Sequence, residues 1–221
     1  MSLIKAVMFD LDGVIVDTSN HHYLSWKKLC LELGYNLTET GNEFIKGLSR
    51  EDSFLKIIDM ANISFSEEKF KEYLIKKNSY YLNLIDTITP KNILPGVQSF
   101  LGYLKKKSVK ISLCSSSKNA KLVLKKLDLI SFFDFIIDGN DIKMSKPDPE
   151  IFLTASKKLK TEPRDCLVFE DSQSGIDAAN NAGMIVVGIG NKTKLKNLEY
   201  CFPDFLKIPD HLKKYFFNEE I

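Results

Sequence analysis

The chain has 221 residues, 44% hydrophobic and 27% charged, a composition typical of a globular protein with a substantial core. Its 31 basic and 29 acidic residues leave a net charge of +2, which argues against a nucleic-acid-binding protein. No apolar run approaches the ~18 residues of a membrane span. Lys5 and Asp10 interrupt the apolar start, so neither a membrane segment nor a signal peptide is predicted.

The first predicted element is a buried strand over residues 3–9 that ends in two acids. Residues 7–18 read VMFDLDGVIVDT, with Asp10 at the strand end, Asp12 two residues later and Gly13 breaking the strand. Two neighbouring carboxylates raise each other's pKa, which favours a bound cation or proton. We interpret the pair as a Mg²⁺-supported nucleophile, Asp10, beside an acid/base, Asp12. Two solvated acids at a strand end are the alternative.

Residues 17–87 have a helical pattern and are predicted to form a cap inserted after this strand. Helices are expected over 41–47, 51–61 and 66–83, after one that contains Trp26 and stops at Gly34. Ser49 and Ser66 are typical of helix starts. Thr18 and residues 86–89 are the expected hinges of the cap.

From Pro90 onward, strands and helices alternate, which predicts a parallel sheet covered by helices. The expected strands are 109–114, 134–138, 166–170 and 185–189, and the expected helices are 96–107, 118–128, 148–160 and 173–182. The predicted fold class is therefore α/β: a Rossmann-like parallel-sheet core, residues 1–16 and 88–221, with an inserted α-helical cap. The four cysteines are far apart in sequence and are interpreted as free thiols of a protein in the reducing cytoplasm.

Two further strand ends carry groups suited to phosphate. Ser115 follows the strand VKISLC, and its hydroxyl with the amides of Ser116 and Ser117 can hold a phosphate at the start of the next helix. The alternative role of Ser115 is an N-cap of that helix. Lys146 lies in the stiff sequence SKPDP and can supply a positive charge to a phosphoryl group; an ordinary solvated lysine is the alternative.

The strand CLVFE ends in a second pair of acids, Glu170 and Asp171. Mg²⁺ prefers a few carboxylate oxygens in near-octahedral geometry and keeps several waters. Asp10, Glu170 and Asp171, with the backbone carbonyl of Asp12, can supply such ligands. The alternative is a pair of acids stabilised by the dipole of the following helix.

The motifs at these four strand ends together resemble the haloacid dehalogenase superfamily of aspartate-nucleophile phosphotransferases over essentially the whole chain. The resemblance implies that Asp10 attacks phosphorus and that Asp12 is the acid/base. It also implies that Ser115 and Lys146 hold the transferring phosphoryl group, and that the terminal acids hold Mg²⁺.

The predicted cap and the SSSKN sequence resemble the β-phosphoglucomutase family within that superfamily. The resemblance implies that His22, Trp26 and the KGLSREDS segment, residues 46–53, meet a sugar phosphate, with Arg50 gripping the distal phosphate. The phosphate- and substrate-binding residues are then Thr18, His22, Trp26, Lys46, Gly47, Arg50, Ser115, Ser116, Ser117, Lys118, Asn119 and Lys146. His22 as a helix-surface residue, and Lys46 and Arg50 as solvated charges, are the alternatives.

This second resemblance implies interconversion of β-glucose 1-phosphate and glucose 6-phosphate, with Mg²⁺ as cofactor and β-glucose 1,6-bisphosphate as intermediate and activator. The expected partner is a small sugar phosphate, and a monomer suffices. A sugar-phosphate phosphatase with the same core is the main alternative. A phosphonate hydrolase that uses a cap lysine as a Schiff-base amine is another. A non-catalytic relative would have lost Asp10 or Asp171, and both are present.

Overall fold

The computed structural model describes residues 4–217 and places six parallel strands in one sheet, in the order β3-β2-β1-β4-β5-β6. This is the strand order of doubly wound folds, so the predicted Rossmann-like fold class is confirmed. The strands are β1 Ala6–Phe9, β2 Lys110–Cys114, β3 Phe135–Ile137, β4 Cys166–Glu170, β5 Ile185–Ile189 and β6 Tyr200–Phe202. β1 lies at the centre, between β2 and β4, where the direction of strand addition reverses.

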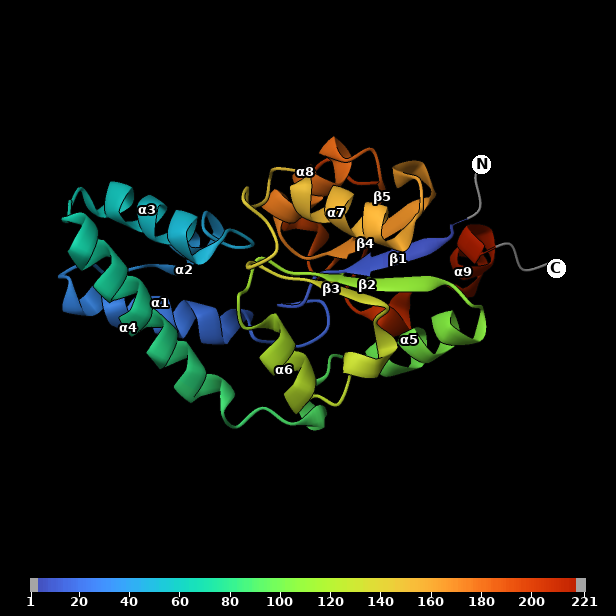
Figure 1. Cartoon of the computed structure of the whole chain (residues 1–221), viewed down its shortest axis with the longest axis horizontal. Helices are drawn as coiled ribbons and strands as arrows, with labels where there is room; N and C mark the ends of the chain where they lie inside the picture. The colour runs from blue at the N-terminus through green and yellow to red at the C-terminus, as the bar shows by residue number, and fades with distance from the viewer. Residues whose placement is uncertain (1–3, 218–221) are drawn as a thin grey trace.

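The sheet is apolar on both faces because helices cover both (Figure 1). Successive side chains of a strand point to opposite faces. Ala6 and Met8 of β1 accordingly pack in one hydrophobic cluster, and Val7 and Phe9 pack in the other. The helices of this core are α5 Val97–Lys106, α6 Ala120–Lys126, α7 Glu150–Leu159, α8 Gln173–Asn181 and α9 Asp210–Phe217. α7 and α8 lie on one face, and α5, α6 and α9 lie on the other.

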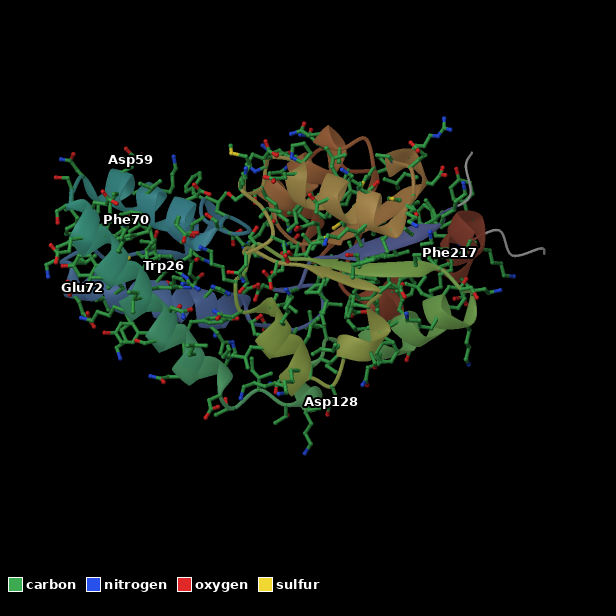
Figure 2. All side chains as sticks on the ribbon, viewed as in Figure 1. Trp26, Asp59, Phe70, Glu72, Asp128 and Phe217 are labelled. Atoms are coloured by element: carbon green, nitrogen blue, oxygen red, sulfur yellow. The ribbon has the colours of Figure 1, made fainter. Side chains whose placement is uncertain are left out.

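Four helices between β1 and the rest of the core project to one side of the sheet (Figure 1). They are α1 Ser19–Glu32, α2 Glu39–Glu43, α3 Arg50–Ala61 and α4 Glu67–Ile85. They enclose a third hydrophobic cluster that includes Trp26 and Phe54, whose rings stack with centroids 5.7 Å apart. In Figure 2, Trp26 and Phe70 lie among these helices, whereas Asp59 and Glu72 lie at their outer surface. We call α1–α4 the cap; its predicted boundaries at residues 17 and 87 stay a prediction.

The predicted helix starts at Ser49 and Ser66 are confirmed by their capping bonds. The hydroxyl of Ser49 accepts a hydrogen bond from the backbone N–H of Asp52, and that of Ser66 accepts one from the N–H of Lys69. These bonds satisfy amides that have no partner within the helix. The alternative role considered for Ser115, as N-cap of the following helix, does not hold, because Asn119 is the residue that precedes α6.

Two other expectations differ from the structure. The helix expected over 41–47 is α2, which ends at Glu43 because the chain turns before Gly47, whose φ is +80°. The strand expected from residue 3 begins at Ala6, and residue 3 lies outside the described residues. β6 and α9 were not expected from the sequence. None of the described helices is long and apolar enough to cross a membrane.

Candidate active site

The acids and the lysine predicted at the strand ends converge beyond β1 and β4. The ammonium of Lys146, which is buried, donates hydrogen bonds to Asp10 Oδ1 at 2.6 Å, to the carbonyl of Cys114 at 3.1 Å and to Glu170 Oε1. Carboxyl ends of parallel strands meet at one edge of the sheet, and the central switch point forms a crevice there. The structure therefore brings Asp10, Lys146 and Glu170 together as one buried charged group.

The charges in this group control each other's ionisation. Burial raises the pKa of Asp10 well above its ordinary value; Lys146 opposes this rise, and the neighbouring Glu170 adds to it. Burial likewise raises the pKa of Asp171 to about 7, although the ammonium of Lys46, 2.7 Å away, works in the other direction. Burial lowers the pKa of Lys146, but Asp10 and Glu170 outweigh it and the net change is upward. Lys146 is therefore a permanent cation beside Asp10.

The carboxylates at this edge suit a hard divalent cation. Asp10, Glu170 and Asp171 each offer one oxygen, and these oxygens lie within 4.8 Å of one another. Oxygen donors in this number, with room for waters and a phosphate, match the preference of Mg²⁺. Two of these carboxylates pack directly against glycines, where a larger residue would clash with them. A Cβ on Gly13 would lie 1.9 Å from Asp171 Oδ2, and a Cβ on Gly175 would lie 1.9 Å from Glu170 Oε1. The donor set therefore fits the predicted metal.

Asp12 lies apart from this group and faces α1. Its Oδ1 accepts a hydrogen bond from the hydroxyl of Thr18 and lies 3.5 Å from His22 Nε2. Burial by itself would raise the pKa of Asp12, but His22 and Thr18 outweigh it, so the pKa is below its ordinary value. Burial and the charge of Lys77 lower the pKa of His22. Asp12 is therefore an ionised carboxylate at neutral pH and is available as a base.

A pocket lies between this edge and the cap, with about 700 Å³ of empty space when its mouth is included. Most of the predicted site residues line it: Asp10, Asp12, His22, Trp26, Lys46, Gly47, Arg50, Ser115, Ser116, Ser117, Lys118 and Asp171. The remaining four, Thr18, Asn119, Lys146 and Glu170, lie outside its wall, although Thr18, Lys146 and Glu170 contact residues already described.

The SSSKN segment makes the core side of the pocket. The hydroxyl of Ser115 accepts a hydrogen bond from the N–H of Ser117 at 3.1 Å, and that of Ser116 donates to the carbonyl of Gly47 at 2.8 Å. The side-chain amide of Asn119 donates to Asn78 Oδ1 in α4 at 2.9 Å. Ser116 and Asn119 thus contact the cap.

The cap is closed on the core through direct contacts near the pocket. Lys46 pairs with Asp171, and its backbone carbonyl accepts a hydrogen bond from the Ser174 hydroxyl at 2.9 Å. A Cβ on Gly47 would lie 2.3 Å from Ser172 Oγ. A glycine at residue 47 therefore permits both the positive φ and the close approach of the Ser172 and Ser174 side chains.

Residues 7–189 match the family model described as haloacid dehalogenase-like hydrolase. The chain belongs to this family. It is 42% identical to a protein named beta-phosphoglucomutase from Bacillus subtilis over 188 residues, 84% of this chain and 83% of that protein. It is 31% identical over 182 residues to a phosphorylated carbohydrates phosphatase from Thermotoga maritima, 81% of this chain and 82% of that protein. A crystal structure of beta-phosphoglucomutase from Clostridium difficile matches with a TM-score of 0.93 and 42% identity, covering 98% of both chains.

Leu48 and Ser53 of the predicted segment 46–53 also line the pocket, but four other lining residues were not singled out from the sequence: Ser19, Asn42, Ile45 and Lys77. Lys77 is the most informative, because it is buried and its ammonium lies 2.9 Å from His22 Nδ1. Leu74, Lys77, Tyr81 and Ile85 are the buried residues of α4, at helical spacing. A lysine within an otherwise apolar stripe was the signal that could have identified it.

Proposed function

We propose that the chain is a Mg²⁺-dependent β-phosphoglucomutase that interconverts β-D-glucose 1-phosphate and D-glucose 6-phosphate. The observation that carries the proposal is one pocket lined by Asp10, which pairs with the buried Lys146 behind the wall, and also by the cations Arg50 and Lys118 from the cap and the core. A mutase must hold two phosphates at once, so it needs cations at two places. The 42% identity to the Bacillus subtilis beta-phosphoglucomutase over most of both chains supports the same activity.

Asp10 is the proposed nucleophile and Asp12 the proposed acid/base. Phosphorylated Asp10 transfers its phosphoryl group to the 6-hydroxyl of β-glucose 1-phosphate, and Asp12 accepts the hydroxyl proton. The product, β-glucose 1,6-bisphosphate, turns round in the pocket and returns its other phosphoryl group to Asp10. Asp12 then protonates the departing oxygen, and glucose 6-phosphate leaves. A carboxylate nucleophile that forms an aspartyl phosphate is established chemistry.

Positive charge is what this transfer requires from its surroundings. Lys146 remains protonated beside Asp10 and can neutralise an oxygen of the transferring group. Asp10, Glu170, Asp171 and the backbone carbonyl of Asp12 are the proposed Mg²⁺ ligands, and the bound ion would neutralise further phosphoryl charge. The carboxylate of Asp12 contacts His22 and Thr18, whereas Lys146 pairs with Asp10 and Glu170, so the group proposed to exchange the proton is not the one paired with the lysine.

Water competes with the sugar for the phosphoryl group. A sugar hydroxyl held in line with the phosphoryl group has an effective molarity of about 10⁵–10⁸ M, far above the concentration of water. This advantage is greatest when the cap also excludes solvent from the pocket. We propose that residues 17–87 open and close as a unit, with the Lys46–Asp171 contact and the close approach at Gly47 formed in the closed state. Closure both excludes water and brings Arg50 to the distal phosphate.

A coupled assay tests this proposal. The protein is supplied with Mg²⁺, β-glucose 1-phosphate and a trace of β-glucose 1,6-bisphosphate, and glucose 6-phosphate is followed through its dehydrogenase. We expect steady formation that stops in Asp10→Asn and falls strongly in Arg50→Ala, whereas the α-anomer gives none. Turnover in Asp10→Asn would contradict the nucleophile, and an unchanged rate in Arg50→Ala would remove Arg50 from the site.

A sugar-phosphate phosphatase is the second candidate. The Thermotoga maritima phosphorylated carbohydrates phosphatase, 31% identical over most of both chains, favours it. Release of inorganic phosphate from the same mixture, at a rate equal to the loss of substrate, would establish it in place of the mutase.

A monomeric state and a cytoplasmic location complete the proposal. Among the described cysteines, Cys30, Cys114 and Cys166 are buried and free and Cys201 is partly exposed and free, which supports a reducing compartment. Gel filtration with light scattering would test the monomer.

A further inference from the structure

The cations that line the pocket differ in what they contact. Lys46 is paired with Asp171, Lys77 with His22, and Lys118 with a carboxylate of the cap. Within residues 4–217, the guanidinium of Arg50 has no hydrogen bond or ion pair. Burial lowers the pKa of Arg50 without changing its positive charge at neutral pH. Arg50 is therefore ready to receive an anion, whereas Lys118 is already engaged.

The carboxylate that engages Lys118 belongs to Glu51, the residue next to Arg50. Lys118 Nζ lies 2.6 Å from Glu51 Oε1, and the two side chains are 35% and 39% exposed. Partial burial raises the pKa of Glu51, but the hydrogen bond from Lys118 and nearby positive charges outweigh it and the net change is downward. Glu51 is thus an anion at the edge of the pocket, and it lies in the first turn of α3, where the helix dipole also favours negative charge.

The segment that carries Lys118 is held firmly by the core. A Cβ on Gly139 would lie 2.4 Å from the carbonyl oxygen of Ser116 and 3.1 Å from Lys118 Cγ, so the backbone of this segment lies directly against Gly139. The start of the Lys118 side chain is therefore fixed, and its ammonium can change partner by rotation of the outer part of the side chain alone.

We propose that Glu51 is a specificity-determining residue that acts as an internal substitute for the distal phosphate. Its carboxylate holds Lys118 in the absence of ligand, and the phosphate of a sugar phosphate must displace it to reach Lys118. This inference rests on the proposed function, since it concerns the distal phosphate of that reaction. A dianionic phosphate competes well with a single carboxylate, whereas a sugar hydroxyl does not. Glu51 therefore selects for ligands that carry a phosphate at this end.

The inference predicts that removal of the Glu51 charge tightens the binding of a phosphate. The probe is glucose 6-phosphate with Mg²⁺, and the readout is the fluorescence of Trp26, which is the single tryptophan and lines the pocket. Partly exposed ion pairs are weak, so Glu51→Gln should lower the dissociation constant about two- to fivefold. The control is Glu43→Gln, which removes another cap–core ion pair, with Lys194 at 3.0 Å, and should leave the constant unchanged.

Two further variants define what each result means. If Arg50→Ala weakens binding but Glu51→Gln does not tighten it, the distal site stands and the inference about Glu51 is wrong. If Arg50→Ala also leaves binding unchanged, the distal site of the proposed function fails, and the inference fails with it. The effect of Glu51→Gln must also depend on Lys118. In a Lys118→Met background, Glu51→Gln should leave the dissociation constant of glucose 6-phosphate unchanged. A lower dissociation constant in that background would contradict the displacement of Glu51 from Lys118 by the phosphate.

Discussion

Replacement of the buried Lys77 by methionine should stabilise the folded chain. The ammonium lies 4.8 Å from the ring centroid of Trp26 and 5.1 Å from that of Tyr81, and 2.9 Å from His22 Nδ1. Burial lowers the pKa of Lys77 from 10.5 to about 7, with the charge of Arg50 adding to the effect. Methionine is similar in length and needs no hydration, so it can fill the same space without the cost of a buried charge.

The magnitude follows from this pKa. Each tenfold change in proton affinity is worth about 1.4 kcal/mol, so the lowering from 10.5 to about 7 disfavours the charged lysine by about 5 kcal/mol, and by about 4 kcal/mol at pH 7. The two cation–π contacts of Lys77, with Trp26 and Tyr81, offset part of this cost by stabilising the folded state by about 0.5–2 kcal/mol each. We therefore expect Lys77→Met to raise the free energy of unfolding at pH 7 by about 2 kcal/mol.

The pH dependence gives a second readout. The pKa of Lys77 in the folded state lies below its value of 10.5 in the unfolded state, so between about pH 7 and 10.5 the unfolded chain binds more protons. The contribution of Lys77 to the free energy of unfolding therefore rises with pH over that window, by about 2 kcal/mol between pH 7 and 9. Because methionine does not titrate, the free energy of unfolding of Lys77→Met should not show this rise with pH.

Urea unfolding at pH 7, 8 and 9 measures both quantities. The matched control is Lys76→Met on the same helix, since Lys76 is exposed and pairs with Glu32 at 2.6 Å; it should keep the pH slope of the original chain. A Lys77→Met chain that is less stable at pH 7, or that keeps the same slope, would refute the reasoning. The turnover of this variant should nevertheless fall, because Lys77 lines the pocket.

Three other changes have definite expected outcomes. Gly47→Ala should lower the free energy of unfolding by about 1–3 kcal/mol in urea titrations, because φ is +80° and a Cβ would lie 2.3 Å from Ser172 Oγ; an unchanged midpoint would contradict the close approach. Asp12→Ala should reduce the initial rate about 10²–10⁴-fold, and a small effect would mean that another group moves the proton. A thiol reagent should modify only Cys201 rapidly in the native protein, since burial raises the pKa of Cys114 to about 12 and Cys30 and Cys166 are also buried; rapid reaction at a second thiol would contradict this.

The part of the fold that the sequence predicted well is the part in which apolar strands end in charged residues. The runs before Asp10 and Glu170 are continuously apolar, as strands covered on both faces must be, and their ends were expected at one edge of the sheet. Lys146 was placed there from the stiff sequence SKPDP, and the resemblance to the superfamily added its role. Its contacts with two carboxylates involve residues 136 and 24 positions away in the chain, which no local pattern contains.

The errors arose where tertiary contacts outweigh local preference. β6 is three residues long and only partly buried, and α9 is short and packs by Phe216 and Phe217 against a distant part of the sheet. The alternative role of Ser115 as a helix N-cap fails for a local reason, since its hydroxyl accepts a hydrogen bond from the N–H of Ser117 before α6 begins. The role of Glu51 depends on Lys118, 67 residues away.

The proposed function requires one pocket to pass a phosphoryl group from Asp10 to a sugar hydroxyl rather than to water. The most direct test is ³¹P NMR of the protein with Mg²⁺, β-glucose 1-phosphate and a trace of β-glucose 1,6-bisphosphate, with every phosphorus signal followed over time. We expect the signal of β-glucose 1-phosphate to be replaced by that of glucose 6-phosphate, with little inorganic phosphate. Inorganic phosphate as the main product would contradict the proposed transfer to the sugar.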